Sequence, residues 1–321
     1  MNNMEIDAQI LTQAADTLRG WALDEELKAK VLGNPQQASL VSRAARRYTA
    51  GETIQDALAL LNANTKRGHR GSIECVGESV READVAERET QEFIELARSI
   101  GESGPSATLS FDLSHVGLLV SADLGLTNAA RIAQAARDAG TSVMISAEGS
   151  DRTDLVLEVY DRLAADFPET GITLQARLHR TTDDLARAMK NPGPIRVVKG
   201  AFLESETVAH ARDSAPMTQA YLAMAGTLVR AGHRVNLATH DAGMVLALKN
   251  DLGTDLHGEH VEFEMLQGLG TQLLDSLQAE GYATREYIVY GPQWWLYVLN
   301  RIAEHPDRVI LALADLGHSN N

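Results

Sequence analysis

The sequence contains a single cysteine, Cys75, among its 321 residues, so it cannot form an intramolecular disulfide or a cysteine-rich metal site. Basic residues are also scarce: 29 Lys and Arg face 44 Asp and Glu, which gives a formal net charge of −15. Binding to phosphates requires a basic face. The acidic balance therefore argues against a nucleic acid as partner.

Long apolar stretches are missing as well. No run approaches the roughly 18 apolar residues of a membrane span, and the N-terminal MNNMEIDAQILTQAADTL lacks the basic and then apolar segments of a signal peptide. We therefore expect a cytoplasmic protein without an integral membrane segment. The sequence has no HxH or HExxH motif and no GxGxxG after a first strand, so it predicts no metal site and disfavours an open nucleotide-binding sheet.

The residues that are present form two patterns. Residues 5 to about 65 have apolar positions at helical spacing. From residue 72 onward, short apolar runs alternate with helical patterns of ten or more residues. The runs that predict strands are SIECV, ATLSFDL, SVMISAE, ITLQARL, IRVVKG, RVNLATH, HVEFEML and TREYIVYG.

Alternating strands and helices imply right-handed βαβ units and a parallel sheet. Eight of them predict an α/β fold, a TIM-like (β/α)8 barrel preceded by N-terminal helices. We expect residues 1–70 to be an N-terminal helical segment, and residues 71–321 to be the barrel with its C-terminal helix over the active site. A doubly wound open sheet is the alternative fold.

Polar or ionisable residues stand where the predicted strands end, which is where barrel enzymes carry their catalytic groups. In RVVKGAF (196–202), Arg196 and Lys199 flank two valines. Because such cations are rarely buried unless paired, we expect an anion to meet them at the mouth of the barrel. The strand-end residues are Glu78, Asp112, Glu148, Arg177, Lys199, Thr239, His240, Glu264 and Tyr290.

Two enzyme classes could use some of these strand-end residues. Lys199 could form the Schiff base of a lyase or aldolase. His240 with Glu148 and Glu264 could serve a divalent-metal hydrolase, although its usual motifs are lacking. Elsewhere, Trp294 and Trp295 predict helix packing. The histidines expected in loops or at the surface are His69, His115, His179 and His257.

Five motifs occur in order along residues 72–304: GESV at 77–80, RVVKGAF at 196–202, ATH at 238–240, EFEML at 262–266 and YGPQWWLYVLNRIAE at 290–304. Together they resemble the flavin-dependent proline dehydrogenase family. The resemblance implies a distorted (β/α)8 barrel that binds FAD across its strand ends.

The resemblance also implies roles for residues near the cofactor. Arg196 is expected beside the reactive nitrogen of the flavin ring, where a cation stabilises the reduced flavin. Gln175 is expected to hydrogen-bond the ring, and Lys199 to neutralise the pyrophosphate. The complete set of expected FAD-binding residues is Gln175, Arg196, Val197, Lys199, Gly200, Ala201, Thr239, His240 and Glu264.

The substrate side departs from the family pattern. Asp112 replaces a lysine, Ser146 an aspartate, Arg177 a tyrosine and Asn300 the first arginine of a pair, whereas Arg301 is retained. The residues expected to be catalytic are Arg196, Ser146 and Tyr287. Those expected to bind substrate are Asp112, Arg177, Tyr287, Tyr297, Asn300 and Arg301.

The function implied by the resemblance is dehydrogenation of a C–N, or an N–N, bond in a small amine or amino acid. Hydride passes to the flavin, and the electrons go on to a quinone or another acceptor. One arginine with an asparagine holds a carboxylate less firmly than two arginines do, so we expect a substrate other than free proline. The alternatives are a genuine L-proline dehydrogenase forming pyrroline-5-carboxylate, a substrate attached to a carrier protein, and a non-catalytic flavin-binding protein.

Overall fold

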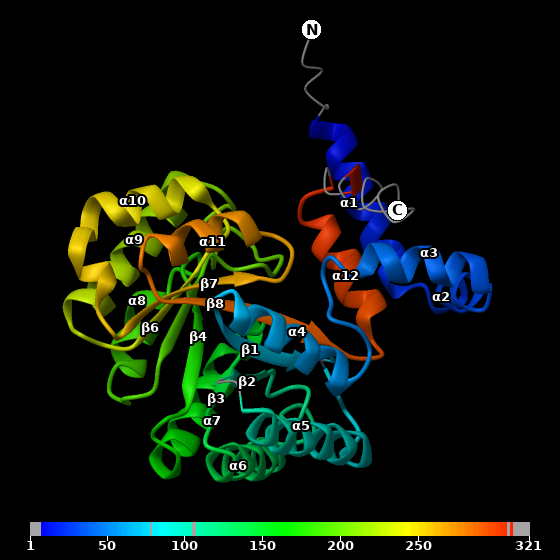
Figure 1. Cartoon of the computed structure of the whole chain (residues 1–321), viewed down its shortest axis with the longest axis horizontal. Coiled ribbons are helices and arrows are strands. Elements are labelled where there is room, and N and C mark those ends of the chain that lie inside the picture. Colours follow the sequence, from blue (N-terminus) through cyan, green and yellow to red (C-terminus); the bar gives the residue numbers. More distant parts are fainter. Residues whose placement is uncertain (1–7, 78, 105–106, 307–308, 311–321) are drawn as a thin grey trace, which may run out of the picture.

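Eight parallel strands close into a barrel in chain order (Figure 1). The computed structural model describes residues 8–77, 79–104, 107–306 and 309–310. All eight predicted strands are present, and the fold prediction is confirmed. The strands are β1 Arg70–Cys75, β2 Ala107–Phe111, β3 Val143–Ile145, β4 Gly171–Gln175, β5 Ile195–Val198, β6 Val235–Ala238, β7 Val261–Leu266 and β8 Thr284–Tyr290.

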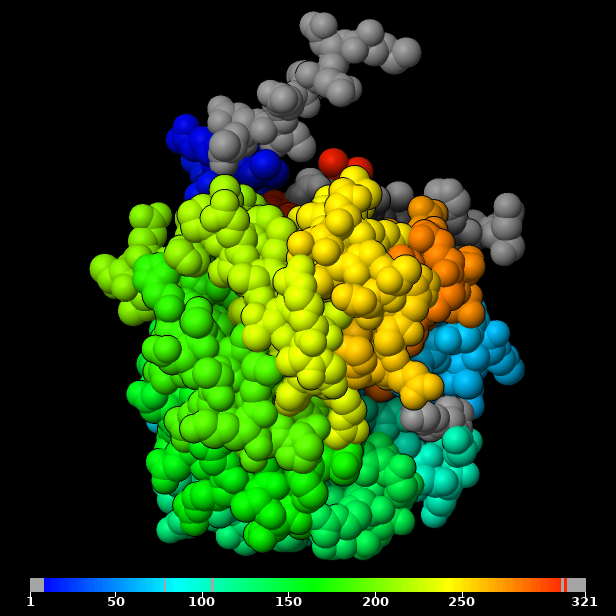
Figure 2. Space-filling model, turned by 90° about the vertical axis from the view of Figure 1, so that its left-hand side faces the viewer, coloured from blue at the N-terminus to red at the C-terminus, as the bar shows by residue number. Residues whose placement is uncertain are grey.

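Helices follow the strands and cover the outside of the barrel. In the longest, α5, the buried Ala86, Phe93, Ala97 and Ile100 recur at helical spacing between many charged residues. The helices from α5 onward are α5 Ala83–Ser103, α6 Ala122–Asp138, α7 Thr153–Asp166, α8 Thr181–Ala188, α9 Ala215–Arg230, α10 Ala242–Leu252, α11 Thr271–Ala279 and α12 Trp294–Ala303. Figure 2 views the side of the barrel that the green and yellow helices cover. Within the described residues, no helix has the length and apolar content that a membrane span requires.

Four helices precede the barrel: α1 Ala8–Leu23, α2 Glu25–Leu32, α3 Pro35–Ala45 and α4 Ile54–Lys66. They divide between two hydrophobic clusters. Ile54, Ala57 and Leu61 of α4 belong to the barrel core, whereas α1 and α3 pack with α12 beside the barrel (Figure 1). A domain boundary at residue 70 stays a prediction, and the packing places α4 with the barrel.

Trp294 and Trp295 hold α12 against the N-terminal helices. Both rings are buried, and their indole nitrogens donate to Glu52 Oε1 at 3.0 Å and to the Trp21 carbonyl at 2.9 Å. Their predicted role in helix packing is confirmed. The same contacts fix α12 beside the carboxyl ends of the strands.

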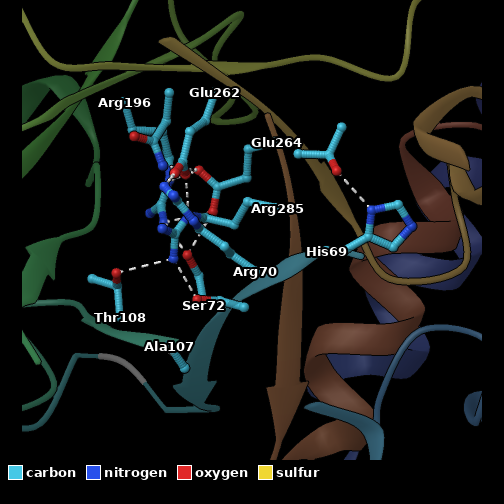
Figure 3. A network of polar contacts seen from close by, with 12 residues as sticks. His69, Arg70, Ser72, Ala107, Thr108, Arg196, Glu262, Glu264 and Arg285 are labelled. Carbon is cyan, nitrogen blue, oxygen red and sulfur yellow. Dashed lines mark hydrogen bonds and ion pairs between the residues drawn. The ribbon is translucent and has the colours of Figure 1, made fainter. Parts of the chain in front are cut away.

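An ionic cluster fills the interior of the barrel near the amino-terminal ends of the strands (Figure 3). Arg285 Nε donates to Glu262 Oε2 at 2.6 Å, and Arg285 Nη1 donates to Thr108 Oγ1 at 3.0 Å. Arg70 pairs with the other oxygen of Glu262. Glu262 and Arg285 are buried and paired, as the interior of a protein requires, whereas the side chain of Arg70 is about half exposed.

Two of the four histidines expected in loops or at the surface are buried. His69 bonds Thr284 Oγ1 at 2.7 Å and Asp275 Oδ1 at 2.9 Å, and His115 bonds Glu89 Oε2 at 2.8 Å. Both lie in loops, as predicted, but away from the surface, and a carboxylate distant in sequence bonds one ring nitrogen of each.

Candidate active site

A cavity of about 650 Å³ opens at the carboxyl ends of the strands, bounded by the loop after β5 and by α12. All but two of the predicted site residues line it. They are Asp112, Ser146, Gln175, Arg177, Arg196, Lys199, Gly200, Ala201, Thr239, His240, Glu264, Tyr287, Tyr297 and Arg301. The topology of the barrel thus brings residues from β2 to α12 together.

The two exceptions are Val197 and Asn300. Val197 packs in the hydrophobic core, because successive side chains of a strand face opposite sides, and Val198 lines the cavity in its place. Asn300 is exposed on α12 and does not line the cavity. Among the strand-end residues, Tyr290 points away from the cavity and donates to Glu92 at 3.0 Å, and Glu78 lies outside the described residues.

Arg196 forms the floor of the cavity. Its Nε donates to Glu264 Oε2 at 2.7 Å and its Nη2 to Glu264 Oε1 at 2.9 Å (Figure 3). Nη2 also donates to Ser72 Oγ and Ser110 Oγ, each at 3.1 Å. The expectation that this cation stands at the mouth is therefore wrong, because its register on β5 places it inside, where a glutamate is its anion.

Both side chains of the Arg196–Glu264 ion pair are almost completely buried. Only 3% of Arg196 and 1% of Glu264 is exposed. Burial alone would raise the pKa of Glu264, but the Arg196 guanidinium, with help from Arg285 and Ser72, holds that pKa below its ordinary value. The Tyr287 ring lies 4.7 Å from the Arg196 guanidinium. The floor is thus a fixed, hydrogen-bonded cation covered by an aromatic ring.

Lys199 lies at the rim, at the end of β5. Its ammonium donates to Asp241 Oδ2 at 2.8 Å and lies 3.4 Å from Asp213 Oδ1. Asp241 also caps α10, because its Oδ1 accepts from the amides of Gly243 and Met244. The hydrogen bond from Lys199 lowers the pKa of Asp241. Asp241 thus occupies the N-terminus of α10, and Lys199 is the cation that a phosphate at this part of the rim would meet.

Arg177 anchors the loop that follows β5. Its Nε donates to the His210 carbonyl at 3.1 Å and its Nη1 to the Phe202 carbonyl at 2.8 Å. Gly200 makes this packing possible: its φ is +110°, and a Cβ there would lie 2.8 Å from the Arg177 side chain. The geometry gives Arg177 a positioning task; a direct role in holding substrate stays a prediction.

Thr239 and His240 hold the rim between β6 and β7. Thr239 Oγ1 accepts from the Asp241 amide at 3.2 Å, and His240 Nε2 accepts from the Leu266 amide at 2.9 Å. These bonds fix the chain as it leaves the barrel. Their predicted contact with the cofactor stays a prediction.

The roof of the cavity comes from α12. Tyr297 and Arg301 are one turn apart, and the guanidinium lies 5.4 Å from the tyrosine ring. Arg301 Nη1 donates to Glu304 Oε2 at 2.8 Å. A cation and an aromatic ring therefore face the floor from above.

One lining residue, Glu74, is absent from the sequence prediction. It lies two residues after Ser72 on β1, so both side chains face the barrel interior. Ser146 Oγ donates to Glu74 Oε2 at 2.9 Å. A signal was available in SIECV, where a glutamate interrupts an apolar strand.

The residues present fit a flavin. The side-chain oxygen of Gln175, Oε1, is buried without a hydrogen-bond partner among the described residues, while its Nε2 donates to the Glu148 carbonyl at 2.8 Å. A buried acceptor left without a donor is costly, and a ring N–H of a flavin is such a donor. With Arg196 below and Lys199 at the rim, the cavity offers a place for both the ring and the phosphates.

The two other enzyme classes find less support. The described residues contain no group of three or more ligating side chains placed to hold a metal. Glu148 accepts from the Ser114 amide at 2.9 Å and from Arg152 at 3.1 Å, and it does not line the cavity with His240 and Glu264. A Schiff-base lysine is usually activated by desolvation, whereas Lys199 is paired with two carboxylates.

Comparison with known proteins shows the family of the chain. The sequence model of the proline dehydrogenase family matches residues 57–296. Proline dehydrogenase of Deinococcus radiodurans is 34% identical over 272 residues, covering 82% of this chain and 86% of that protein. Proline dehydrogenase 1 of Bacillus subtilis is 29% identical over 271 residues, covering 84% and 89%.

Solved structures agree on the fold. Proline utilization A (PutA) from Bdellovibrio bacteriovorus, inactivated by N-propargylglycine, superposes with a TM-score of 0.76 at 19% identity. The match covers 96% of this chain and 38% of that larger one. The chain belongs to the proline dehydrogenase family and is an FAD-dependent dehydrogenase.

Proposed function

We propose that this protein is a genuine L-proline dehydrogenase, which oxidises the C–N bond of proline to form pyrroline-5-carboxylate. The observation that carries the proposal is the meeting of Tyr287, Tyr297 and Arg301 in one cavity above Arg196. Relatives named proline dehydrogenase match most of the chain. A substrate other than proline has no comparable support, so the altered Asp112 and Ser146 are better regarded as variation within one activity.

Each group in the cavity has a task in this reaction. Arg301 binds the substrate carboxylate by charge-assisted hydrogen bonds, and the rings of Tyr287 and Tyr297 pack against the small apolar ring of the substrate. Bound FAD supplies the chemistry by accepting a hydride. Arg196 holds a positive charge at the floor of the cavity, where it would stabilise the negative charge of a reduced flavin ring. The electrons then leave for a quinone or another acceptor.

Anaerobic mixing with L-proline tests this function. The purified protein should carry FAD, and L-proline should bleach the flavin absorbance faster than N-substituted prolines or hydrazine-like amino acids do. If one of those amines bleaches the flavin and L-proline does not, the substrate is shifted. If only NADH or NADPH bleaches it, the protein is a reductase and the proposal fails.

Lys199→Ala should weaken FAD retention, because an ammonium that meets a pyrophosphate contributes about 1.5–3 kcal/mol. The dissociation constant for FAD should rise about 10- to 100-fold, as measured by fluorescence titration of the apoprotein. Lys249→Ala is the matched control, since Lys249 pairs with Glu280 at 2.7 Å on the surface. Equal affinities of the two variants would contradict a phosphate contact for Lys199.

A further inference from the structure

Glu74 occupies the layer of the barrel interior directly above the Arg196 floor. Two residues earlier on the same strand face, Ser72 Oγ contacts both Arg196 Nη2 at 3.1 Å and Glu264 Oε1 at 2.7 Å. Glu74 therefore stands one step closer to the carboxyl ends of the strands, where it lines the cavity. It is a carboxyl group on the substrate side of the floor.

One oxygen of Glu74 is held and the other is available. Ser146 Oγ, just beyond β3, donates to Glu74 Oε2 across the interior. No described residue hydrogen-bonds Oε1, so this oxygen can accept from a ligand in the cavity. The orientation of the carboxyl group is thus fixed by one serine, and its second oxygen has a vacant acceptor position.

The surroundings make Glu74 ready to take up a proton. Burial raises its pKa, against the opposing effects of the Ser146 hydrogen bond and of nearby cations. The charges of Arg196 on β5 and Arg301 on α12 moderate this rise but do not cancel it. The other titratable groups around it are His115, Tyr297, Cys75 and, at the end of β2, Asp112.

We propose that Glu74 is the proton acceptor for the amine of the substrate, and that Ser146 positions it. This inference rests on the proposed function, because it assigns a step of that same oxidation. An ammonium cannot lose a hydride from the neighbouring carbon, since its nitrogen has no free electron pair to form the C=N bond. The enzyme must therefore take one proton from the zwitterion first.

One N–H bond of the substrate ammonium breaks, an O–H bond forms on Glu74 Oε1, and the nitrogen keeps the electron pair. That pair becomes the second bond of the C=N group when the adjacent C–H leaves as hydride to the FAD of the proposed function. Arg301 at the roof and Glu74 above the floor then bind the two charges of one zwitterion from opposite sides.

The test is the pH dependence of flavin reduction by L-proline, measured as kcat/KM in stopped flow. The parent should lose activity only below the pKa of Glu74. In Glu74→Gln the substrate must enter as the free amine. The acid limb, which is the fall in kcat/KM toward low pH, should therefore move toward the ordinary pKa of an alkyl amine, about 10.4. At pH 7.5 the variant should be at least about 100-fold slower, and it should recover as the pH rises.

Matched variants separate this role from a structural one. Glu286 is also a buried strand glutamate whose pKa burial raises, but it faces Arg67 outside the cavity, so Glu286→Gln should keep the parent profile. Ser146→Ala removes the bond that favours the ionised carboxyl, and its acid limb should shift upward by a smaller amount. Glu74→Asp retains a carboxylate and should keep an acid limb near the parent's, even at a lower rate.

The outcomes distinguish the two proposals. If the parent does not reduce its flavin with proline at any pH, the proposed function fails. If the parent is active but Glu74→Gln is slower by the same factor at every pH, Glu74 is structural and the inference is overturned. If Asp112→Asn moves the acid limb and Glu74→Gln does not, Asp112 is the acceptor, which also overturns it. Should Glu74→Gln not fold, loss of the acid limb in Glu74→Asp would overturn it equally.

Discussion

Replacing either Arg196 or Glu264 alone should lower the free energy of unfolding by about 3–5 kcal/mol, because each change leaves the other charge buried without its partner. Arg196→Met and Glu264→Leu are the single variants, and urea denaturation followed by circular dichroism measures the effect. The double variant should recover much of the loss, since an apolar pair of similar volume replaces a buried ion pair at little net cost. The coupling between the two changes should therefore be large.

An exposed ion pair provides the control. Arg230 and Asp251 lie 2.9 Å apart with side chains 57% and 50% exposed, so Arg230→Ala should cost less than about 1 kcal/mol. If the double variant is no more stable than the single variants, Arg196 and Glu264 do not affect stability as a coupled ion pair. A stable double variant that binds FAD but reduces it slowly with proline would separate the catalytic task of Arg196 from its structural one.

The stability from this pair should also depend on pH. Arg196 holds the pKa of Glu264 below its ordinary value of 4.5 against the opposing effect of burial. A depressed carboxyl pKa contributes stability above the unfolded value, and this contribution is lost as the pH falls through the folded value. The parent should therefore lose more stability below pH 4.5 than the double variant does.

The barrel was predictable because its strands are buried on both sides and read as short apolar runs, such as VMI at 143–145. The rule that strand ends carry the site predicted six of the lining residues, namely Asp112, Arg177, Lys199, Thr239, His240 and Glu264. This rule correctly placed Lys199, Thr239 and His240 around one cavity. Understanding how the lining residues interact required knowledge of which residues meet across the barrel.

Pairing across the interior is what the sequence could not supply. Arg196 and Glu264 are 68 positions apart, and only the closed strand order brings them into contact. The same limit explains why Glu74 escaped notice. A glutamate in an apolar strand has no meaning until Ser146, 72 positions later, supplies its hydrogen bond.

Helix phase explains the error at Asn300. Adjacent residues on an α-helix point about 100° apart, so only one of Asn300 and Arg301 can face the cavity squarely. The N-terminal packing of Trp294 and Trp295 determines the rotation of α12, and it turns Arg301 inward and Asn300 to solvent. That packing depends on α1, whose contact with α12 no local pattern reveals.

Arg301→Met should lower kcat/KM for L-proline at least about 30-fold, because losing one partner of a buried charged contact costs about 2–5 kcal/mol. The guanidinium lines the roof opposite Arg196, and its planar fork suits a carboxylate. Stopped-flow flavin reduction measures the effect. Arg301→Lys should recover part of the activity, since it restores the charge without the planar fork.

Pyrrolidine is the internal control, because it has the same ring and amine as proline but no carboxylate. If Arg301 binds the carboxylate, the parent should prefer proline strongly over pyrrolidine, and Arg301→Met should remove most of that preference while changing the rate with pyrrolidine little. A general distortion of α12 would instead slow both substrates alike, because Tyr297 on the same helix also lines the cavity. An unchanged preference for proline in the variant would show that another cation binds the carboxylate, and Arg177 or Lys199 would then be the residue to replace next.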